Sequence, residues 1–448
     1  MNATFETTPE TTYTPEHIAQ IVYGPLEEAG TITTGLDYYK PTMSQLAYEQ
    51  QPDAQVSFTF KNRGEQRLMD CINFSDLQDR LDAIQARGWQ ESELGYLGGL
   101  QNSAGEAVFA PDYLDYLRTH ELPRCNVGYE PATKDLYAQT SGDWPMVTFW
   151  ETVLMSEVNE LYFEGYVRRH GLNVLDVYDE GERRLAAKID ILREHPEIKF
   201  ADFGTRRHFS LRWQEYVVER LLSDVPDNFV GTSNVGLAKK YGIKPIGTFA
   251  HEMPMVYAGL ADAAGGSDED IRDSHQVFLN DWFNRYGVDL STGLTDTFKS
   301  AFFFSDFTPE QAQNWKGVRH DSGDPVEFGE RLIKFYEDNG IDAKTKTVVF
   351  SDGLDINDIV TLQAHFGDRI NVLFGWGTTL TNDLGIKPLN VVMKATQVNG
   401  VDNVKLSDNV GKHTGPEAQV QRYERIFDSV VQLVLFGKRG LEARRAAA

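Results

Sequence analysis

The sequence predicts an α/β protein, with a (β/α) barrel in its second half and an α+β domain before it. In the second half, short apolar runs repeatedly end in a polar or glycine-rich tip, and a helix-like stretch follows most tips. The tips are DFGTRR (202–207), GTSN (231–234), GTFAHE (247–252), LTDT (294–297), RHDSGD (319–324), FSDGLD (350–355) and FGWGTT (374–379). Because a barrel gathers such strand ends at one mouth, the pattern indicates an enzyme.

Three parts of the chain are predicted. They are an α+β domain (1–150), the barrel domain (151–387), and a C-terminal hairpin and helix that pack back on the N-terminal domain (388–448). Residues 1–17 are polar and acidic and are predicted to form a disordered arm, whereas residues 54–64 alternate like a strand. Residues 152–171 are expected to form a long buried helix, and Asn399-Gly400 is the turn signal of the hairpin.

The formal charge of −24 and the pI near 4.8 restrict the partners of this chain. Such a surface repels nucleic acid and anionic membranes, and the sequence has no run of about 18 apolar residues that would span a bilayer. A small anionic substrate therefore requires a local cluster of Arg and Lys inside an acidic protein. The only cysteines, Cys71 and Cys125, exclude a disulfide framework and favour a cytoplasmic location.

The tip RHDSGDP (319–325) offers two carboxylates, a hydroxyl and a flexible backbone at a strand end. Such a tip can hold Mg²⁺ and a ribose, with Arg319 beside it to bind an anion. The other interpretation is an aspartate N-cap with a tight turn, because Pro325 suits the first turn of a helix.

The late tips FSDGLD and FGWGTT are rich in glycine. In barrels, loops after the last strands frequently bind phosphate through backbone N–H groups. FGWGTT is no dinucleotide fingerprint, because Leu380 stands where a third glycine is needed, and the chain has no P-loop. Each tip taken alone is also compatible with an ordinary turn.

The tip DFGTRR places Phe203 and two arginines at a strand end. Phe203 can stack on a planar ring, and Arg206 can neutralise a phosphate or a carboxylate. The alternative for Phe203 is core packing, and Arg207 is interpreted as structural.

His251, in GTFAHE, can act as a base, a phosphate acceptor or a metal ligand, or it can be a hydrogen-bonded structural histidine. A zinc protease helix is excluded, because Met255 stands where HExxH needs its second histidine. Taken together, the tips predict a site for a phosphorylated sugar, Mg²⁺ and a flat aromatic ring.

The tips, together with LDYYK (36–40), WETVL (150–154) and VVMK…VKLSD (391–408), resemble nicotinate phosphoribosyltransferase over nearly the whole chain. This family joins nicotinate to 5-phosphoribosyl-1-pyrophosphate (PRPP), giving nicotinate mononucleotide and pyrophosphate, and couples the reaction to ATP hydrolysis. The resemblance implies an irregular (β/α) barrel of the type II phosphoribosyltransferase kind. It also implies a role in NAD biosynthesis, Mg²⁺ as cofactor, ATP as co-substrate, and a homodimer with shared active sites.

Roles for individual residues follow from the resemblance. His251 would be phosphorylated by ATP, Phe203 and a partner-chain Tyr39 would sandwich the pyridine ring, and Arg319 would pair with the nicotinate carboxylate. Arg206 would lie near the ring and the phosphates. The remaining assignments are Asp296, Asp321 and Asp352 to the ribose and Mg²⁺ (Asp321 and Asp352 as metal ligands), Gly353, Gly377 and Thr378 to the 5-phosphate, and Arg63, Lys394 and Lys405 to pyrophosphate.

Ser233 bears on the choice of substrate, because nicotinamide-using relatives carry an acidic residue at this tip. A carboxylate there would repel nicotinate, so Ser233 favours nicotinate. The alternatives are a nicotinamide- or quinolinate-type phosphoribosyltransferase, an unrelated phosphosugar aldolase or isomerase, and a catalytically silent binding protein of the same fold. No tip supplies the Schiff-base lysine or general-base glutamate that the second needs, and His251, Arg319, Asp321 and Asp352 argue against the third.

Overall fold

The computed structural model describes residues 19, 22–23, 30–133 and 135–429. The arm predicted over 1–17 and the end of the predicted C-terminal helix lie outside these residues. Two sheets organise the described part of the chain, one antiparallel and one parallel.

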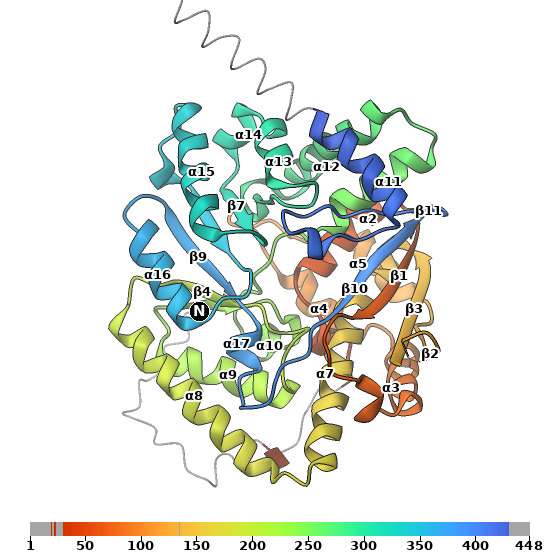
Figure 1. Cartoon of the computed structure of the whole chain (residues 1–448), viewed down its shortest axis with the longest axis vertical. Helices are drawn as coiled ribbons and strands as arrows, with labels where there is room; N and C mark the ends of the chain where they lie inside the picture. Colours follow the sequence, from red (N-terminus) through yellow and green to blue (C-terminus); the bar gives the residue numbers. More distant parts are fainter. Residues whose placement is uncertain (1–18, 20–21, 24–29, 134, 430–448) are drawn as a thin grey trace, which may run out of the picture.

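The antiparallel sheet has the strand order β11-β10-β1-β3-β2. Its strands are β1 (Gln55–Asn62), β2 (Asn126–Glu130), β3 (Asp135–Asp143), β10 (Val391–Val398) and β11 (Val401–Asp402). The predicted hairpin is confirmed, since Asn399 and Gly400 connect β10 to β11 with φ values of 46° and 84°. Figure 1 shows β10 beside β1, so the hairpin completes the sheet of the N-terminal domain.

Helices surround this sheet and lead into the second one. They are α2 (Tyr39–Gln50), α3 (Phe74–Arg87), α4 (Glu91–Gly99), α5 (Pro111–Thr119), α6 (Trp144–Val147), α7 (Trp150–Arg169) and α8 (Val174–Glu194), with 3₁₀ turns η1 (Thr33–Gly35) and η2 (Leu68–Asp70). Helix α7 is the predicted long helix and is largely buried. It ends before Gly171, whose φ of 62° suits glycine at a helix end.

In the parallel sheet, the described residues give the strand order β5-β4-β9-β8-β7-β6. The strands are β4 (Phe200–Asp202), β5 (Phe229–Thr232), β6 (Thr292–Leu294), β7 (Gly317–His320), β8 (Thr347–Phe350) and β9 (Asn371–Trp376). Each of these strands ends at or within one of the predicted tips. The repeated strand and tip is therefore confirmed for every tip except GTFAHE.

GTFAHE differs because the segment before it, residues 243–250, forms no strand. Pro245 has no N–H group to donate to a ladder, which disfavours a regular strand here. The segment instead makes single bonds to both edge strands: Ile246 N donates to Thr232 O at 2.9 Å, and Thr248 Oγ1 donates to Thr292 O at 2.9 Å. It thereby bridges β5 and β6, and the barrel is irregular at this point.

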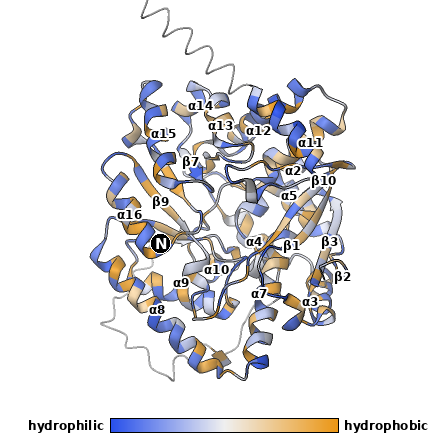
Figure 2. Ribbon diagram, in the orientation of Figure 1, coloured by the Kyte–Doolittle hydropathy of each residue, from blue (hydrophilic) through white to orange (hydrophobic). Residues whose placement is uncertain are grey.

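The helices of the second half are α9 (Leu211–Asp224), α10 (Val235–Tyr241), α11 (Glu252–Ala263), α12 (Asp268–Tyr286), α13 (Ser300–Asp306), α14 (Pro309–Asn314), α15 (Pro325–Asp338), α16 (Ile356–Phe366) and α17 (Thr378–Thr381), with η3 (Gly287–Leu290), η4 (Ala343–Thr345) and η5 (Val410–Lys412). Most of them cover the outside of the parallel sheet, whereas α17 and η5 contribute residues to a cavity at its strand tips. Figure 2 shows apolar and hydrophilic residues alternating along outer helices such as α8, as expected of amphipathic helices. Among the described residues, no helix combines the length and apolarity needed to cross a bilayer.

The C-terminal helix is described over residues 417–429 and packs on the barrel domain. The sequence had instead predicted that it packs on the N-terminal domain. Phe427 stacks on Phe298 with ring centres 3.9 Å apart, and Phe302 meets Phe427 edge to face. The segment that precedes this helix is thereby held over the carboxyl ends of β6 and β7, since Leu406 N donates to Thr297 O at 2.8 Å.

Candidate active site

The tips of the parallel strands meet at a cavity of about 830 Å³, which residues of β1 and β10 line from the other side. Among the described residues that line it, eight are Lys or Arg and three are acidic. The predicted cluster of cations inside an acidic protein is therefore present. The predicted site residues in the lining are Arg63, Phe203, Arg206, His251, Arg319, Asp321, Asp352, Gly353, Gly377, Thr378, Lys394 and Lys405.

The buried side chain of Asp202 fixes the conformation of the DFGTRR turn through hydrogen bonds. Its carboxylate is fully buried and accepts hydrogen bonds from Gly204 N (2.7 Å), Thr232 Oγ1 (2.7 Å) and Gln214 Nε2 (2.8 Å). Burial raises its pKa to about 6, although these bonds oppose the shift. A Cβ at position 204 would lie 2.1 Å from Thr381 Oγ1, so only glycine lets the turn pack on α17.

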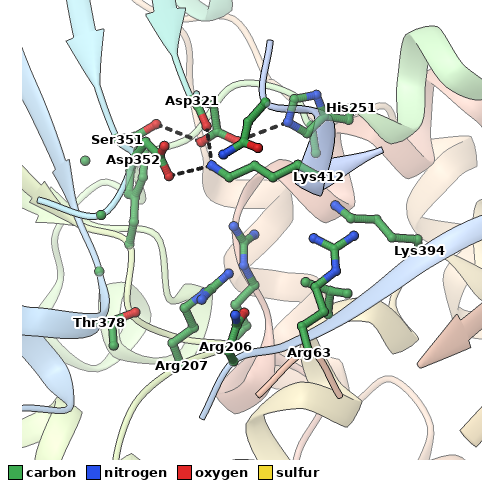
Figure 3. Close-up of a pocket in the computed structure, with 18 of the residues that line it drawn as sticks. Arg63, Arg206, Arg207, His251, Asp321, Ser351, Asp352, Thr378, Lys394 and Lys412 are labelled. Carbon is green, nitrogen blue, oxygen red and sulfur yellow. Dashed lines mark hydrogen bonds and ion pairs between the residues drawn. The ribbon is translucent and has the colours of Figure 1, made fainter. Parts of the chain in front are cut away.

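His251 lies immediately before α11 with its ring fixed on both sides. Nδ1 is 3.0 Å from Thr297 Oγ1, while Nε2 is 3.0 Å from Asp321 Oδ2 and 2.9 Å from Lys405 Nζ. Figure 3 shows the link from His251 to Asp321 at the edge of the cavity. Burial and the nearby Lys405 lower the pKa of His251 to about 4, so the imidazole is neutral at neutral pH.

A neutral imidazole has two tautomers here. With the proton on Nδ1, the ring donates to Thr297 and Nε2 accepts from Lys405, which leaves Nε2 a nucleophile. With the proton on Nε2, the ring donates to Asp321. Since Nε2 has both a donor and an acceptor within reach, the site can supply or take up a proton at this atom.

Asp296 stands behind His251 and is fully buried. Its Oδ2 accepts from Ser322 Oγ (2.6 Å) and Ser407 Oγ (3.0 Å), but no described residue donates a hydrogen bond to Oδ1. His251, Asp296 and Asp321 bring ligand atoms within 4.8 Å of one another, and an unpaired buried carboxylate oxygen fits a divalent cation.

This grouping differs from the predicted metal pair, Asp321 with Asp352. Asp352 Oδ1 is held by Lys412 Nζ at 2.7 Å, and the same ammonium donates to Asp321 O at 3.0 Å (Figure 3). Asp352 and Asp296 each have a cationic partner, since Lys405 Nζ lies 3.5 Å from Asp296 Oδ2, but Asp296 Oδ1 accepts no hydrogen bond from any described residue.

Arg319 presents its guanidinium to the aromatic ring predicted to stack on substrate. Its carbon atom Cζ lies 5.5 Å from the centre of the Phe203 ring. Nε donates to Ser351 Oγ at 2.7 Å and Nη2 donates to Asp321 Oδ1 at 2.8 Å, which leaves Nη1 for a ligand. A planar cation beside an aromatic face is suited to a flat anionic ring.

Tyr39 was expected from a partner chain, but the chain's own Tyr39 already lies beside this cavity. Its hydroxyl accepts a hydrogen bond from Arg206 Nη1 at 2.5 Å, and the side chain is 6% exposed. Ser233 is also buried, with Oγ donating to Asp37 Oδ1 at 2.6 Å, and Asp37 Oδ2 lies 3.8 Å from Arg206 Nη1. Tyr39 and Ser233 thus act on the cavity through Arg206 and do not line it.

Several lining residues were absent from the predicted site, and Arg207 was predicted to be structural. The structure places Arg207 in the cavity lining, half-buried and beside Arg206 (Figure 3). The others are Lys61, Glu151, Ala250, Leu294, Ser351, Leu354, Gly375, Thr379, Asn390, Val392, Asn409, Gly411, Lys412 and His413. The pair of adjacent arginines and the alternation of Lys61 with Arg63 along a strand were the available signals.

Two family comparisons cover most of the chain. Residues 198–430 match the nicotinate phosphoribosyltransferase (NAPRTase) family, and residues 35–159 match the N-terminal domain of that family. The crystal structure of nicotinate phosphoribosyltransferase from Porphyromonas gingivalis is similar over 88% of this chain and 99% of its own, with 31% identity and a TM-score of 0.77.

Two further solved structures are similar. Nicotinate phosphoribosyltransferase from Vibrio cholerae matches 91% of this chain and 97% of its own, with 28% identity and a TM-score of 0.76. A putative nicotinate phosphoribosyltransferase from Saccharomyces cerevisiae matches 88% of this chain and 97% of its own, with 27% identity and a TM-score of 0.73.

Proposed function

Because the chain belongs to the nicotinate phosphoribosyltransferase family, we propose that it joins nicotinate to PRPP and couples this reaction to ATP hydrolysis. The products are nicotinate mononucleotide and pyrophosphate, a step of NAD biosynthesis. The observation that carries the proposal is a cationic cavity in an acidic chain, in which His251, the Phe203–Arg319 pair and the glycine-rich tips all meet.

In the transfer, the bond between ribose C1 and the pyrophosphate oxygen breaks and the bond from the pyridine nitrogen to C1 forms. Phe203 and Arg319 would orient the ring, with Arg319 Nη1 on the nicotinate carboxylate. The developing charge is cationic on the ribose and anionic on the leaving group, so the lysines and arginines of the cavity stabilise the departure. Positioning and charge stabilisation are sufficient, and no strong general base is needed.

ATP coupling would pass through His251. Nε2 attacks the γ-phosphorus, so a P–N bond forms as the P–O bond to ADP breaks, and water later releases phosphate from the phosphohistidine. Thr297 holds the Nδ1 proton that keeps Nε2 available, and Lys405 neutralises the transferred phosphoryl group. Mg²⁺, held by Asp296 and Asp321, would neutralise charge on the phosphate groups when bound.

Two further properties stay predictions. The homodimer with shared sites is tested by molar mass in solution, although the described residues of a single chain already bring Tyr39, Arg206 and His251 together. A cytoplasmic location rests on the sequence, to which the structure adds that Cys71 and Cys125 are unpaired.

The deciding experiment measures mononucleotide formation from PRPP and Mg²⁺ with nicotinate or nicotinamide, each with and without ATP. Product from nicotinate, increased by ATP, supports the proposal. A preference for nicotinamide would indicate the nicotinamide-type alternative, and no product from either base would indicate a silent binding protein.

Ser233→Asp is expected to raise the KM for nicotinate by about tenfold or more, with a smaller effect on nicotinamide. The reason is that a second carboxylate beside Asp37 competes for the Arg206 guanidinium and repels the nicotinate carboxylate. Steady-state kinetics with both bases measure the change. Ser233→Ala is the control, since it removes the hydroxyl without adding charge, and an equal loss in both variants would contradict the electrostatic explanation.

Pyrophosphate binding is expected to weaken as pH rises through 7. Burial lowers the pKa of Lys394 to about 7, although Glu151 opposes the shift. The protonated form binds an anion better, so affinity falls by up to about tenfold per pH unit above this pKa. Calorimetry measures the affinity for pyrophosphate of wild type and Lys394→Gln at several pH values across this range. Because pyrophosphate itself titrates equally in both experiments, the difference between the two pH profiles reports Lys394 alone. The same pH slope in both proteins would refute the assignment.

A further inference from the structure

The C-terminal helix is held by a hydrophobic cluster of its own. Among the described residues of this helix (417–429), the side chains of Tyr423, Ile426 and Phe427 are buried in a cluster that is separate from the main core. Figure 1 shows the helix in dark blue next to α11. A small cluster of this kind opens at a lower free energy than the main core does. The helix can therefore detach while the main core stays folded.

Other members of this cluster are sequence neighbours of the residues that hold the ring of His251. Phe298 directly follows Thr297, whose Oγ1 lies 3.0 Å from His251 Nδ1. Leu406 directly follows Lys405, whose Nζ lies 2.9 Å from His251 Nε2. One small cluster thus joins the C-terminal helix to both segments that contact the two nitrogens of the imidazole ring.

The C-terminal helix also contacts α11, the helix that begins directly after His251. Ala258 of α11 is fully buried in the cluster, and Arg422 pairs with Asp262, near the end of α11, at 2.7 Å. Gln419 Nε2 donates to the same carboxylate at 2.7 Å. The nucleophile and its partners at Nδ1 and Nε2 therefore belong to three segments that the C-terminal helix holds together.

The turn after β6 has a strained backbone, and the C-terminal helix binds the strained residue. Lys299 has φ 72° and ψ 139°, a conformation that residues other than glycine rarely adopt. Its ammonium pairs with Asp428 at 3.0 Å and with Glu424 at 3.3 Å. Ser407, whose N donates to Thr297 O at 3.4 Å, also has a positive φ, of 61°. Because such strain persists only where surrounding contacts maintain it, the two ion pairs from the helix help to keep Thr297 in place.

We propose that the C-terminal helix positions His251 for its reaction with ATP. With the helix docked, Thr297 and Lys405 hold the two nitrogens of the ring for attack on the γ-phosphorus; without it, the ring loses this alignment and ATP coupling is lost. Phe427 and Lys299 are the positioning residues, and neither lines the cavity. This inference rests on the proposed function and extends it to the C-terminal helix.

The groups proposed to orient nicotinate lie outside this arrangement. Phe203 follows β4 and Arg319 lies on β7, and neither belongs to the cluster. The Arg319 guanidinium is held by Ser351 and Asp321. Detachment of the helix should therefore reduce ATP coupling and leave the ATP-independent transfer to nicotinate in place.

Two isoleucines provide a matched pair of variants. Ile426→Ala deletes a 4% exposed side chain in the cluster, and Ile84→Ala deletes a 3% exposed side chain on α3 in the main core. With nicotinate, PRPP and Mg²⁺ present, phosphate release from ATP and mononucleotide formation with and without ATP are measured. In Ile426→Ala, and likewise in Phe427→Ala, ATP hydrolysis is expected to fall by about 10- to 100-fold while the ATP-independent rate changes by less than about twofold. In Ile84→Ala, neither rate should change by more than about twofold.

An equal fall of both rates in Ile426→Ala would overturn the inference, and so would ATP hydrolysis at the wild-type rate. Lys299→Met decides the matter if the cluster variants fail to fold, since it removes the two ion pairs and leaves the cluster intact. ATP hydrolysis in Lys299→Met is expected to fall by about three- to tenfold, again with the ATP-independent rate retained, and no fall would contradict the inference. A wild-type protein that forms mononucleotide without hydrolysing ATP would instead refute the proposed coupling, and the inference with it.

Discussion

Replacing His251 with alanine is expected to abolish the stimulation of mononucleotide formation by ATP. The ring places a nucleophilic nitrogen beside Lys405 and Asp321 at the cavity, with Thr297 holding its other nitrogen. Its pKa of about 4 keeps the ring neutral and therefore nucleophilic across the physiological range. Loss of the attacking atom should lower ATP hydrolysis by at least about 1,000-fold.

The readout is the ratio of product formed with ATP to product formed without it, which should fall to one in His251→Ala. His365→Ala is the control, because His365 is an exposed histidine on α16 that pairs with Glu330 at 2.7 Å and does not line the cavity. A His251→Ala protein that still hydrolyses ATP in proportion to mononucleotide formed would contradict the phosphohistidine assignment.

The fold was predictable where local pattern decides structure. The apolar runs before DFGTRR or FSDGLD form strands because they are short, β-branched or aromatic, and bounded by turn residues. Asn399-Gly400 gave the hairpin for the same reason. GTFAHE was different, since Pro245 removes a ladder donor and the connection between β5 and β6 depends on contacts with both edges.

The candidate site was predictable in the part that strand ends contribute. Arg319 and Asp352 stand on tips, and parallel strands bring their tips together whatever the loops do. His251 also lies at a predicted tip, although the segment before it forms no strand. Lys61 and Lys412 come from outside this series and reach the cavity through long-range structure. The pairing of β1 with β10 joins residues more than 300 positions apart, which no local pattern encodes.

Arg207 and Tyr39 illustrate a second limit. Adjacent residues of one turn usually point in different directions, so the sequence alone favoured Arg206 for the site and left Arg207 to the scaffold. The turn fixed by Asp202 presents both guanidiniums to the cavity (Figure 3). For Tyr39, the structure shows a hydrogen bond to Arg206 of its own chain, and the contribution of a partner's Tyr39 stays a prediction.

A buried charge network behind the site gives the largest expected effect on stability. Lys40 Nζ is fully buried and lies 2.5 Å from both Glu151 Oε2 and Glu252 Oε2, and it donates to Thr148 Oγ1 at 3.0 Å. Burial would lower the pKa of Lys40, but the two glutamates reverse the shift and raise it. The network joins α2, α7 and α11, so it connects both domains beneath His251.

Lys40→Ala should therefore lower the free energy of unfolding by about 3–5 kcal/mol, because two carboxylates stay buried without their cation. Lys334→Ala is the matched control: Lys334 pairs with Asp338 at 2.9 Å but is 72% exposed, and such a surface pair contributes at most about 1 kcal/mol. Thermal unfolding of the two variants beside wild type measures the contrast, and a second transition in Lys40→Ala would report separation of the domains. Equal midpoints for both variants would show that the two glutamates become protonated or hydrated at little cost.

Since Glu252 directly follows His251 and also accepts from Trp144 Nε1 at 2.6 Å, loss of Lys40 should disturb the nucleophile as well as the fold. The ATP-dependent ratio in Lys40→Ala should consequently fall even at temperatures where the protein remains folded.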